Sequence, residues 1–183
     1  MKRTTLFSLL LLTLTMSTTS ASAHEFIAST TGKTTLKMLT HTVFRTAIGT
    51  TECTGASLLS GQVTTTKSTT IVDTTLFEGC KAFGLNATVS PAKIRSSAEG
   101  TASMLNTVAV KAIGCELKIP SAKNQNLHTI KYKNTNKEIE KRAEVAGITS
   151  SGTGAACTYA EESNDTLEGD ALVGLVSGTL EWK

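Results

Sequence analysis

Apolar and polar residues alternate along short segments of this chain, with the period of two that is typical of half-buried β-strands. The clearest segment is 69–77, in which Ile71, Val72, Leu76 and Phe77 stand among threonines. Similar alternation marks further segments, and Gly and Ser residues punctuate the chain between them; the segments are 34–40, 104–112 and 127–133. The pattern therefore predicts an all-β fold, a single antiparallel β-sandwich-like domain with short strands.

Turns and loops follow from the polar and glycine-rich positions between these segments. Ser60-Gly61 is typical of a hairpin turn, and Ser177-Gly178 predicts a closing hairpin between 166–177 and 179–182. We expect a Gly/Ser loop at 150–156 and an acidic loop at 161–165.

Residues 137–148 have two interpretations. Thr135 with Glu138 resembles a capping box and Gly147 would serve as a C-cap, so a helix is one of them. A strand would place Ile139, Lys141, Ala143 and Val145 on one face. We favour the strand, because strand predictions surround the segment.

The first 23 residues have the pattern of a secretory signal peptide. Lys2 and Arg3 precede an apolar run at 6–16, and Ala21-Ser22-Ala23 is an A-x-A cleavage site. We therefore expect a signal peptide at 1–23 and a secreted all-β domain at 24–183, located outside the cell or in the cell envelope. After cleavage, no apolar run is long enough to span a membrane.

Charge argues against nucleic acid as a partner. Removing Lys2 and Arg3 from the 18 basic residues leaves 16 against 15 acidic residues, a net charge of +1. Surfaces that bind polyanions need clustered Lys and Arg. The densest charged run, 133–142, mixes both signs and is typical of a solvated face.

All four cysteines follow the signal peptide, and an even number in an exported chain favours two disulfides. Three pairings are possible. We predict Cys53–Cys80 and Cys115–Cys157, because pairing of sequence neighbours closes two local loops.

Short motifs around these cysteines resemble those of a large group of uncharacterised exported bacterial all-β proteins. The motifs are Glu52-Cys53, the Ser60-Gly61 pair, and the run Gly79-Cys80-Lys81-Ala82-Phe83-Gly84, which matches Gly-Cys-x-Ala-Phe-Gly. Members often carry further cysteines after this run, where this chain has Val89-Ser90-Pro91. The resemblance implies the fold and export, and no functional residue.

Catalytic motifs are incomplete. Gly32-Lys33-Thr34 matches the end of a phosphate loop, but Ile27 occupies the position of its first glycine. Ser90 and Lys93 have S-x-x-K spacing without the companion S-D-N and K-T-G elements. Acidic residues near the C-terminus match no EF-hand loop and are typical of a solvated surface; they are Glu161, Glu162, Asp165, Glu168 and Asp170.

Copper is the alternative that we retain. Cleavage after Ala23 would make His24 the first residue, whose amine and imidazole would both face one metal ion. His41 or His128 would supply a third nitrogen, and copper favours such ligands. The arrangement resembles the histidine brace of secreted copper oxygenases and copper carriers.

The sequence therefore predicts a secreted, non-enzymatic, β-rich protein that acts as a surface, matrix or binding module for an extracellular or envelope ligand. We expect no cofactor and no catalytic residue. The alternative is a copper-binding oxygenase or copper carrier that uses His24, with His41 and His128 as the further candidate ligands.

Overall fold

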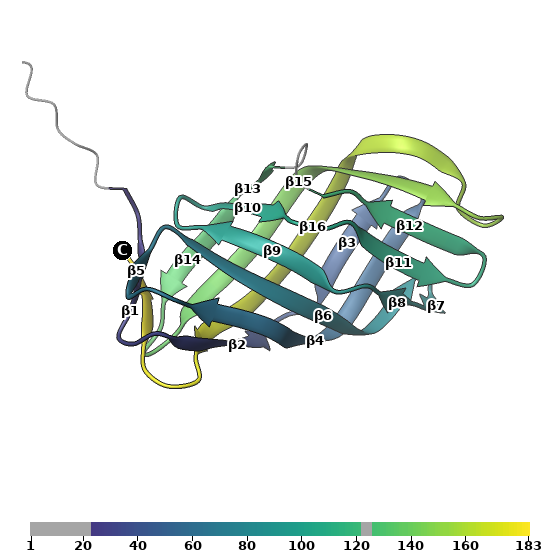
Figure 1. Ribbon diagram of the computed structural model, residues 1–183. Coiled ribbons are helices and arrows are strands. Elements are labelled where there is room, and N and C mark those ends of the chain that lie inside the picture. The colour runs from purple at the N-terminus through teal and green to yellow at the C-terminus, as the bar shows by residue number, and fades with distance from the viewer. Residues whose placement is uncertain (1–22, 122–125) are drawn as a thin grey trace, which may run out of the picture.

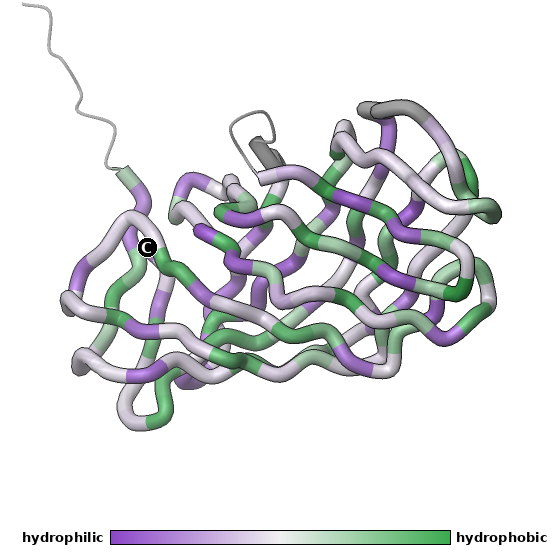
Figure 2. Tube along the Cα trace, turned by 45° about the vertical axis from the view of Figure 1, so that its right-hand side comes forward, coloured by the Kyte–Doolittle hydropathy of each residue, from purple (hydrophilic) through white to green (hydrophobic). Residues whose placement is uncertain are grey.

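The computed structural model describes residues 23–121 and 126–183, without the side chains of 126–128 and 160–163. The described chain is all-β, as the alternation predicts. Figure 2 shows apolar and polar positions following one another along the strands. The strands are β1 (Phe26–Ala28), β2 (Gly32–Met38), β3 (Thr42–Thr46), β4 (Gly49–Val63), β5 (Lys67–Ser68), β6 (Thr70–Ala82), β7 (Leu85–Asn86), β8 (Thr88–Val89), β9 (Ala92–Ser97), β10 (Thr101–Met104), β11 (Val108–Ala112), β12 (Cys115–Ile119), β13 (Asn126–His128), β14 (Ile130–Asn134), β15 (Ile139–Thr153), β16 (Tyr159–Leu175) and β17 (Leu180–Trp182).

Most strands belong to one large antiparallel sheet with the order β13-β10-β9-β6-β4-β2-β16-β15-β12-β11-β8. β14 pairs with β15, β3 pairs with both β16 and β4, and β7 pairs with β6. The sheet turns back on itself, so that β6 and β9 cross in front of β14, β15 and β16 (Figure 1). This arrangement gives two facing layers with inward side chains between them, as the sandwich-like prediction requires.

A second, three-stranded sheet has the order β17-β1-β5. The expected closing hairpin is therefore wrong, because β17 leaves β16 and pairs with β1 instead, Phe26 opposite Trp182. Backbone bonds of 2.7 and 2.9 Å in both directions between Glu25 and Lys183 extend this pairing. Phe26 and Leu180 are buried, so the pairing covers one end of the core.

The strand interpretation of 137–148 is confirmed from Ile139 onward, since residues 139–148 belong to β15. Thr135, the expected helix cap, does not cap a helix. Its hydroxyl and its backbone N–H both donate to the Glu138 carbonyl, each at 2.8 Å, and close the turn into β15. Gly147 has φ +77° beside a register shift between Ala146 and Ile148. The residues that resemble helix caps form a turn and a β-bulge.

At three places, strands continue through polar residues for which a loop or a turn was predicted. The loop predicted at 150–156 is confirmed only for 154–156, because β15 continues to Thr153. The loop predicted at 161–165 is wrong, because β16 begins at Tyr159. Ser150 and Asp165 are buried there and hydrogen-bond to each other, and this contact satisfies both groups inside the sheet.

The turn expected at Ser60-Gly61 is also wrong, since β4 runs on to Val63. A register shift between Leu58 and Ser60 replaces the turn. Gly61 is required by close packing: an added Cβ would lie 2.0 Å from Thr34 Oγ1 and 2.2 Å from Asp73 Oδ1.

Both predicted disulfides are present, and every cysteine is used. Cys53 and Cys80 lie directly opposite each other on β4 and β6. Cys115 opens β12 and reaches Cys157 across 42 residues of sequence. Two disulfides of this kind are consistent with an oxidising compartment.

Two apolar clusters fill the space between the layers. The larger surrounds the disulfides and includes Phe44 and Leu117, and the smaller surrounds Phe26 and Leu180. Tyr132 contacts both clusters. Within the described residues, no helix is long and apolar enough to cross a membrane.

Candidate functional site

β4 faces β2 and β3 along its length, but pairs with them only at two places. β2 is paired through Lys33 with Gln62, and β3 begins its pairing at Thr42 with Cys53. Eight residues lie between Lys33 and Thr42, and eight between Cys53 and Gln62, so both ends keep one register.

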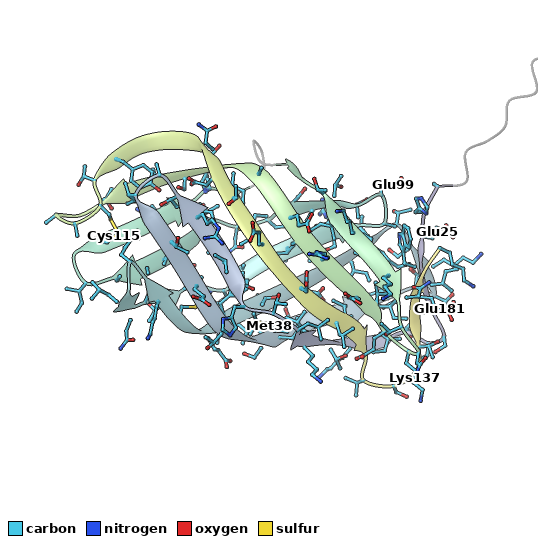
Figure 3. The ribbon with its side chains drawn as sticks, turned by 180° about the vertical axis from the view of Figure 1, so that it is seen from behind. Glu25, Met38, Glu99, Cys115, Lys137 and Glu181 are labelled. Carbon is cyan, nitrogen blue, oxygen red and sulfur yellow. A yellow bond between two sulfur atoms is a disulfide. The ribbon has the colours of Figure 1, made fainter. Side chains whose placement is uncertain are left out.

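Between these ends the two strands have no ladder pairing, although all the residues concerned are described. The unpaired segments are 34–41 and 54–61. Each strand keeps its other neighbour, β16 for β2 and β6 for β4. We call this interruption the β2–β4 opening. Figure 3 labels Met38 beside it, on the long side of the molecule between the end with Glu25 and the end with Cys115.

A cavity of about 100 Å³ lies behind the opening. Its walls come from both sides of the unpaired strands and from the facing layer, and most are apolar: Leu36, Met38, Ala56, Phe77, Ile94 and Leu167. These side chains point inward yet remain partly accessible, because they line the cavity. An adjoining apolar cavity of about 60 Å³ shares Phe77, Ile94 and Leu167 with it.

Lys141 is the charged side chain that reaches this interior from β15. It lies on the same face as Ile139, Ala143 and Val145, as the strand interpretation predicts, and it lines the cavity. Its ammonium donates to Ser96 Oγ of the facing layer at 2.5 Å. Strand alternation thus places a cation in a mostly apolar wall.

A carboxylate, Asp73 of β6, lies near Lys141 without forming an ion pair within 4.0 Å. Asp73 Oδ1 accepts a hydrogen bond of 2.8 Å from Thr34 Oγ1. Asp73, Ser96, Tyr132 and Lys141 line a small cavity of about 10 Å³, the size of one water molecule. We call these four residues the polar layer.

Burial shifts the pKa values of all three titratable groups in this polar layer. Desolvation raises the pKa of Asp73, against the Thr34 hydrogen bond and the Lys141 charge, which lower it. Desolvation lowers the pKa of Lys141, and the charge of Asp73 opposes that effect. The pKa of Tyr132 is raised, again mainly by burial. The interior therefore disfavours each charge separately, and the two charges partly compensate each other.

Two acidic residues at the rim of the cavity form ion pairs with arginines on the outer surface. Glu168 and Asp170 lie 3.7 Å from Arg45 and Arg142, respectively. Both carboxylates thus have cationic partners on the outer surface, and Lys141 remains the charged group of the inner wall. Among the described residues, no group of three His, Cys, Asp or Glu side chains could hold a metal ion.

The candidate copper ligands have separate partners. The His24 ring stacks on Trp182 with centroids 4.6 Å apart, and the His24 backbone N–H donates to Glu99 Oε1 at 2.9 Å. His41 Nδ1 lies 2.5 Å from Glu52 Oε1. The side chain of His128 lies outside the described residues.

The two incomplete motifs have structural roles. Gly32-Lys33-Thr34 begins β2, and its threonine holds Asp73. Ser90 Oγ accepts the backbone N–H of Ala109 at 2.8 Å, and the side chain of Lys93 is exposed.

Comparisons with protein-family models, with curated proteins and with solved structures find no match for this chain. The site therefore rests on its own geometry. Sequence reasoning did not select Lys141 or Asp73 as functional residues. The available signal was a lysine on the apolar face of a predicted strand, together with an aspartate inside the clearly alternating segment 69–77.

Proposed function

We propose that this chain is an exported, non-enzymatic binding protein that holds a small, largely apolar ligand in the cavity behind the β2–β4 opening. Its location is the extracellular space or the cell envelope, where the two disulfides persist. The observation that carries the proposal is the coincidence of an interrupted strand ladder with an apolar cavity directly behind it.

Two physical arguments support this function. A ladder that is paired at both ends and unpaired between them leaves a lens-shaped space, which suits a small molecule better than an inserted strand. Ligand sites in proteins are concave and mostly apolar, with a few polar groups that orient the ligand. The cavity has this composition, with Lys141, Thr42 and Thr75 among its polar lining residues.

Binding of straight-chain alcohols tests the proposal. Each methylene that enters the cavity contributes about 0.8 kcal/mol, so the Kd should fall about fourfold per carbon from 1-butanol to 1-hexanol. Calorimetry or methyl NMR titration measures this series. A Kd that does not change with chain length, or an absence of saturable binding, contradicts the proposed function.

A matched pair of variants locates the site. Ala143 lines the cavity, whereas Ala146 of the same strand is exposed. Ala143→Phe should abolish alcohol binding because the ring occupies the cavity, and Ala146→Phe should leave it unchanged. Equal effects of both variants would place the binding elsewhere.

A further inference from the structure

The cavity has one feature that an apolar ligand leaves unused, the ammonium of Lys141. An ammonium has three N–H donors, and in the described part of the chain it has one hydrogen-bond partner, Ser96 Oγ at 2.5 Å. Asp73 supplies opposite charge from the facing layer, but no ion pair within 4.0 Å joins the two. Donor capacity and positive charge therefore remain for a ligand.

The surroundings strengthen this charge. Lys141 lies among apolar walls, where interactions between charges are screened less than in water. The rim carboxylates Glu168 and Asp170 are paired with Arg45 and Arg142, so they do not compensate Lys141. Of the possible end groups, a carboxylate gains both charge attraction and a hydrogen bond, an alcohol gains the hydrogen bond alone, and an ammonium is repelled.

We propose that Lys141 makes the cavity selective for short-chain monocarboxylates, whose carboxylate contacts the ammonium while the alkyl chain lies along Phe77, Ile94 and Leu167. This inference rests on the proposed function, because it assigns the polar end of the ligand that the cavity holds. The ligand passes between β2 and β4, where Leu36, Met38 and Ala56 border the interior.

Asp73 competes with the ligand carboxylate for the same cation. Thr34 holds the Asp73 carboxylate on the β2 side of the polar layer, and this carboxylate repels an incoming anion. Asp73→Asn keeps an oxygen for the Thr34 hydrogen bond and removes the charge. The variant should therefore bind a carboxylate more tightly and bind an alcohol with unchanged affinity.

The experiment compares hexanoate, 1-hexanol and hexylamine on the full mature protein by calorimetry at pH 7. We expect hexanoate to bind at least tenfold more tightly than 1-hexanol, and hexylamine more weakly than either. Lys141→Met should remove the preference for hexanoate, and Lys131→Met, which changes an exposed lysine of β14, should retain it. Asp73→Asn should increase the preference at least threefold.

Wild-type protein alone can overturn the inference, and Asp73→Asn tests the role of the Lys141 charge if Lys141→Met fails to fold. Equal binding of hexanoate and 1-hexanol overturns the role of Lys141 and leaves the proposed function standing. Binding of no six-carbon ligand overturns the proposed function itself. A preference for hexanoate that survives in folded Lys141→Met also overturns the inference.

Discussion

Removal of the Lys141 ammonium should destabilise the fold through the carboxylate that it leaves behind. Asp73 is 9% exposed, and among the described residues the Thr34 hydroxyl is its one hydrogen-bond donor. Breaking a buried charge pair by removing one partner costs about 3–5 kcal/mol. Because the two charges here are not in direct contact, we expect Lys141→Met to lose about 3 kcal/mol of unfolding free energy at pH 7.

The double variant Lys141→Met/Asp73→Asn tests the physical reason. It removes both charges of the Asp73–Lys141 pair together, so its stability should lie within about 1 kcal/mol of the wild type. The sum of the two single losses should therefore exceed the loss in the double variant by several kcal/mol. Lys131→Met is the control: its ion pair with Glu144 at 3.2 Å is exposed and contributes less than about 1 kcal/mol.

Urea unfolding followed by tryptophan fluorescence measures these differences. Trp182 is the single tryptophan of the chain. Its indole N–H donates to the Ala98 carbonyl at 2.8 Å and its ring centroid lies 5.9 Å from that of Tyr132, so unfolding changes its surroundings. Additive losses in the double variant would refute the coupling between Asp73 and Lys141.

Three further predictions concern other parts of the account. Replacing Cys53 and Cys80 by alanine releases a loop of 27 residues, and we expect unfolding by urea to show a loss of about 3.5 kcal/mol; an unchanged midpoint would contradict this. Gly61→Ala should lower the melting temperature because the added Cβ displaces the Thr34–Asp73 hydrogen bond, whereas Gly55→Ala, whose Cβ would meet ordinary contacts from 3.5 Å, should not. The raised pKa of Asp73 favours its protonated form in the fold, so its stabilising contribution is present below the ordinary value of 3.8 and lost as the pH rises through the raised value; the difference in stability between Asp73→Asn and wild type should change over that window, and a constant difference would refute it.

Strand alternation and cysteine position predict most of the fold. Ile139, Ala143 and Val145 face the interior because a period of two places them on one side of β15. Cys53 and Cys80 pair because their strands are neighbours in the sheet and form one antiparallel ladder. The local sequence pattern is sufficient to predict contacts between neighbouring segments.

Predictions failed where a polar or small residue is explained by contacts with strands distant in sequence. Gly61 resembles a turn residue, but it is small because Thr34 and Asp73 approach it. Asp165 resembles a loop residue, but Ser150 pairs with it inside the sheet. Such reasons depend on strands that are distant in sequence, so local preference does not report them.

The candidate site could not be predicted from the sequence for the same reason. Lys141, Asp73 and Ser96 lie on three strands, and their proximity follows from the return of the sheet over itself. The β2–β4 opening is likewise a property of pairing, since 34–41 and 54–61 carry ordinary strand residues. Sequence reasoning predicted a binding module without a site, and we propose the cavity as the place of its ligand.

Isotope-filtered NOE spectroscopy of hexanoate bound to methyl-labelled protein tests the central claim most directly. The account predicts NOEs from the alkyl chain to the methyl groups of Met38, Ala143 and Leu167, and none to Ile113, which is 82% exposed at the far end of the sheet. NOEs confined to Ile113 or to other surface methyl groups would contradict an interior site.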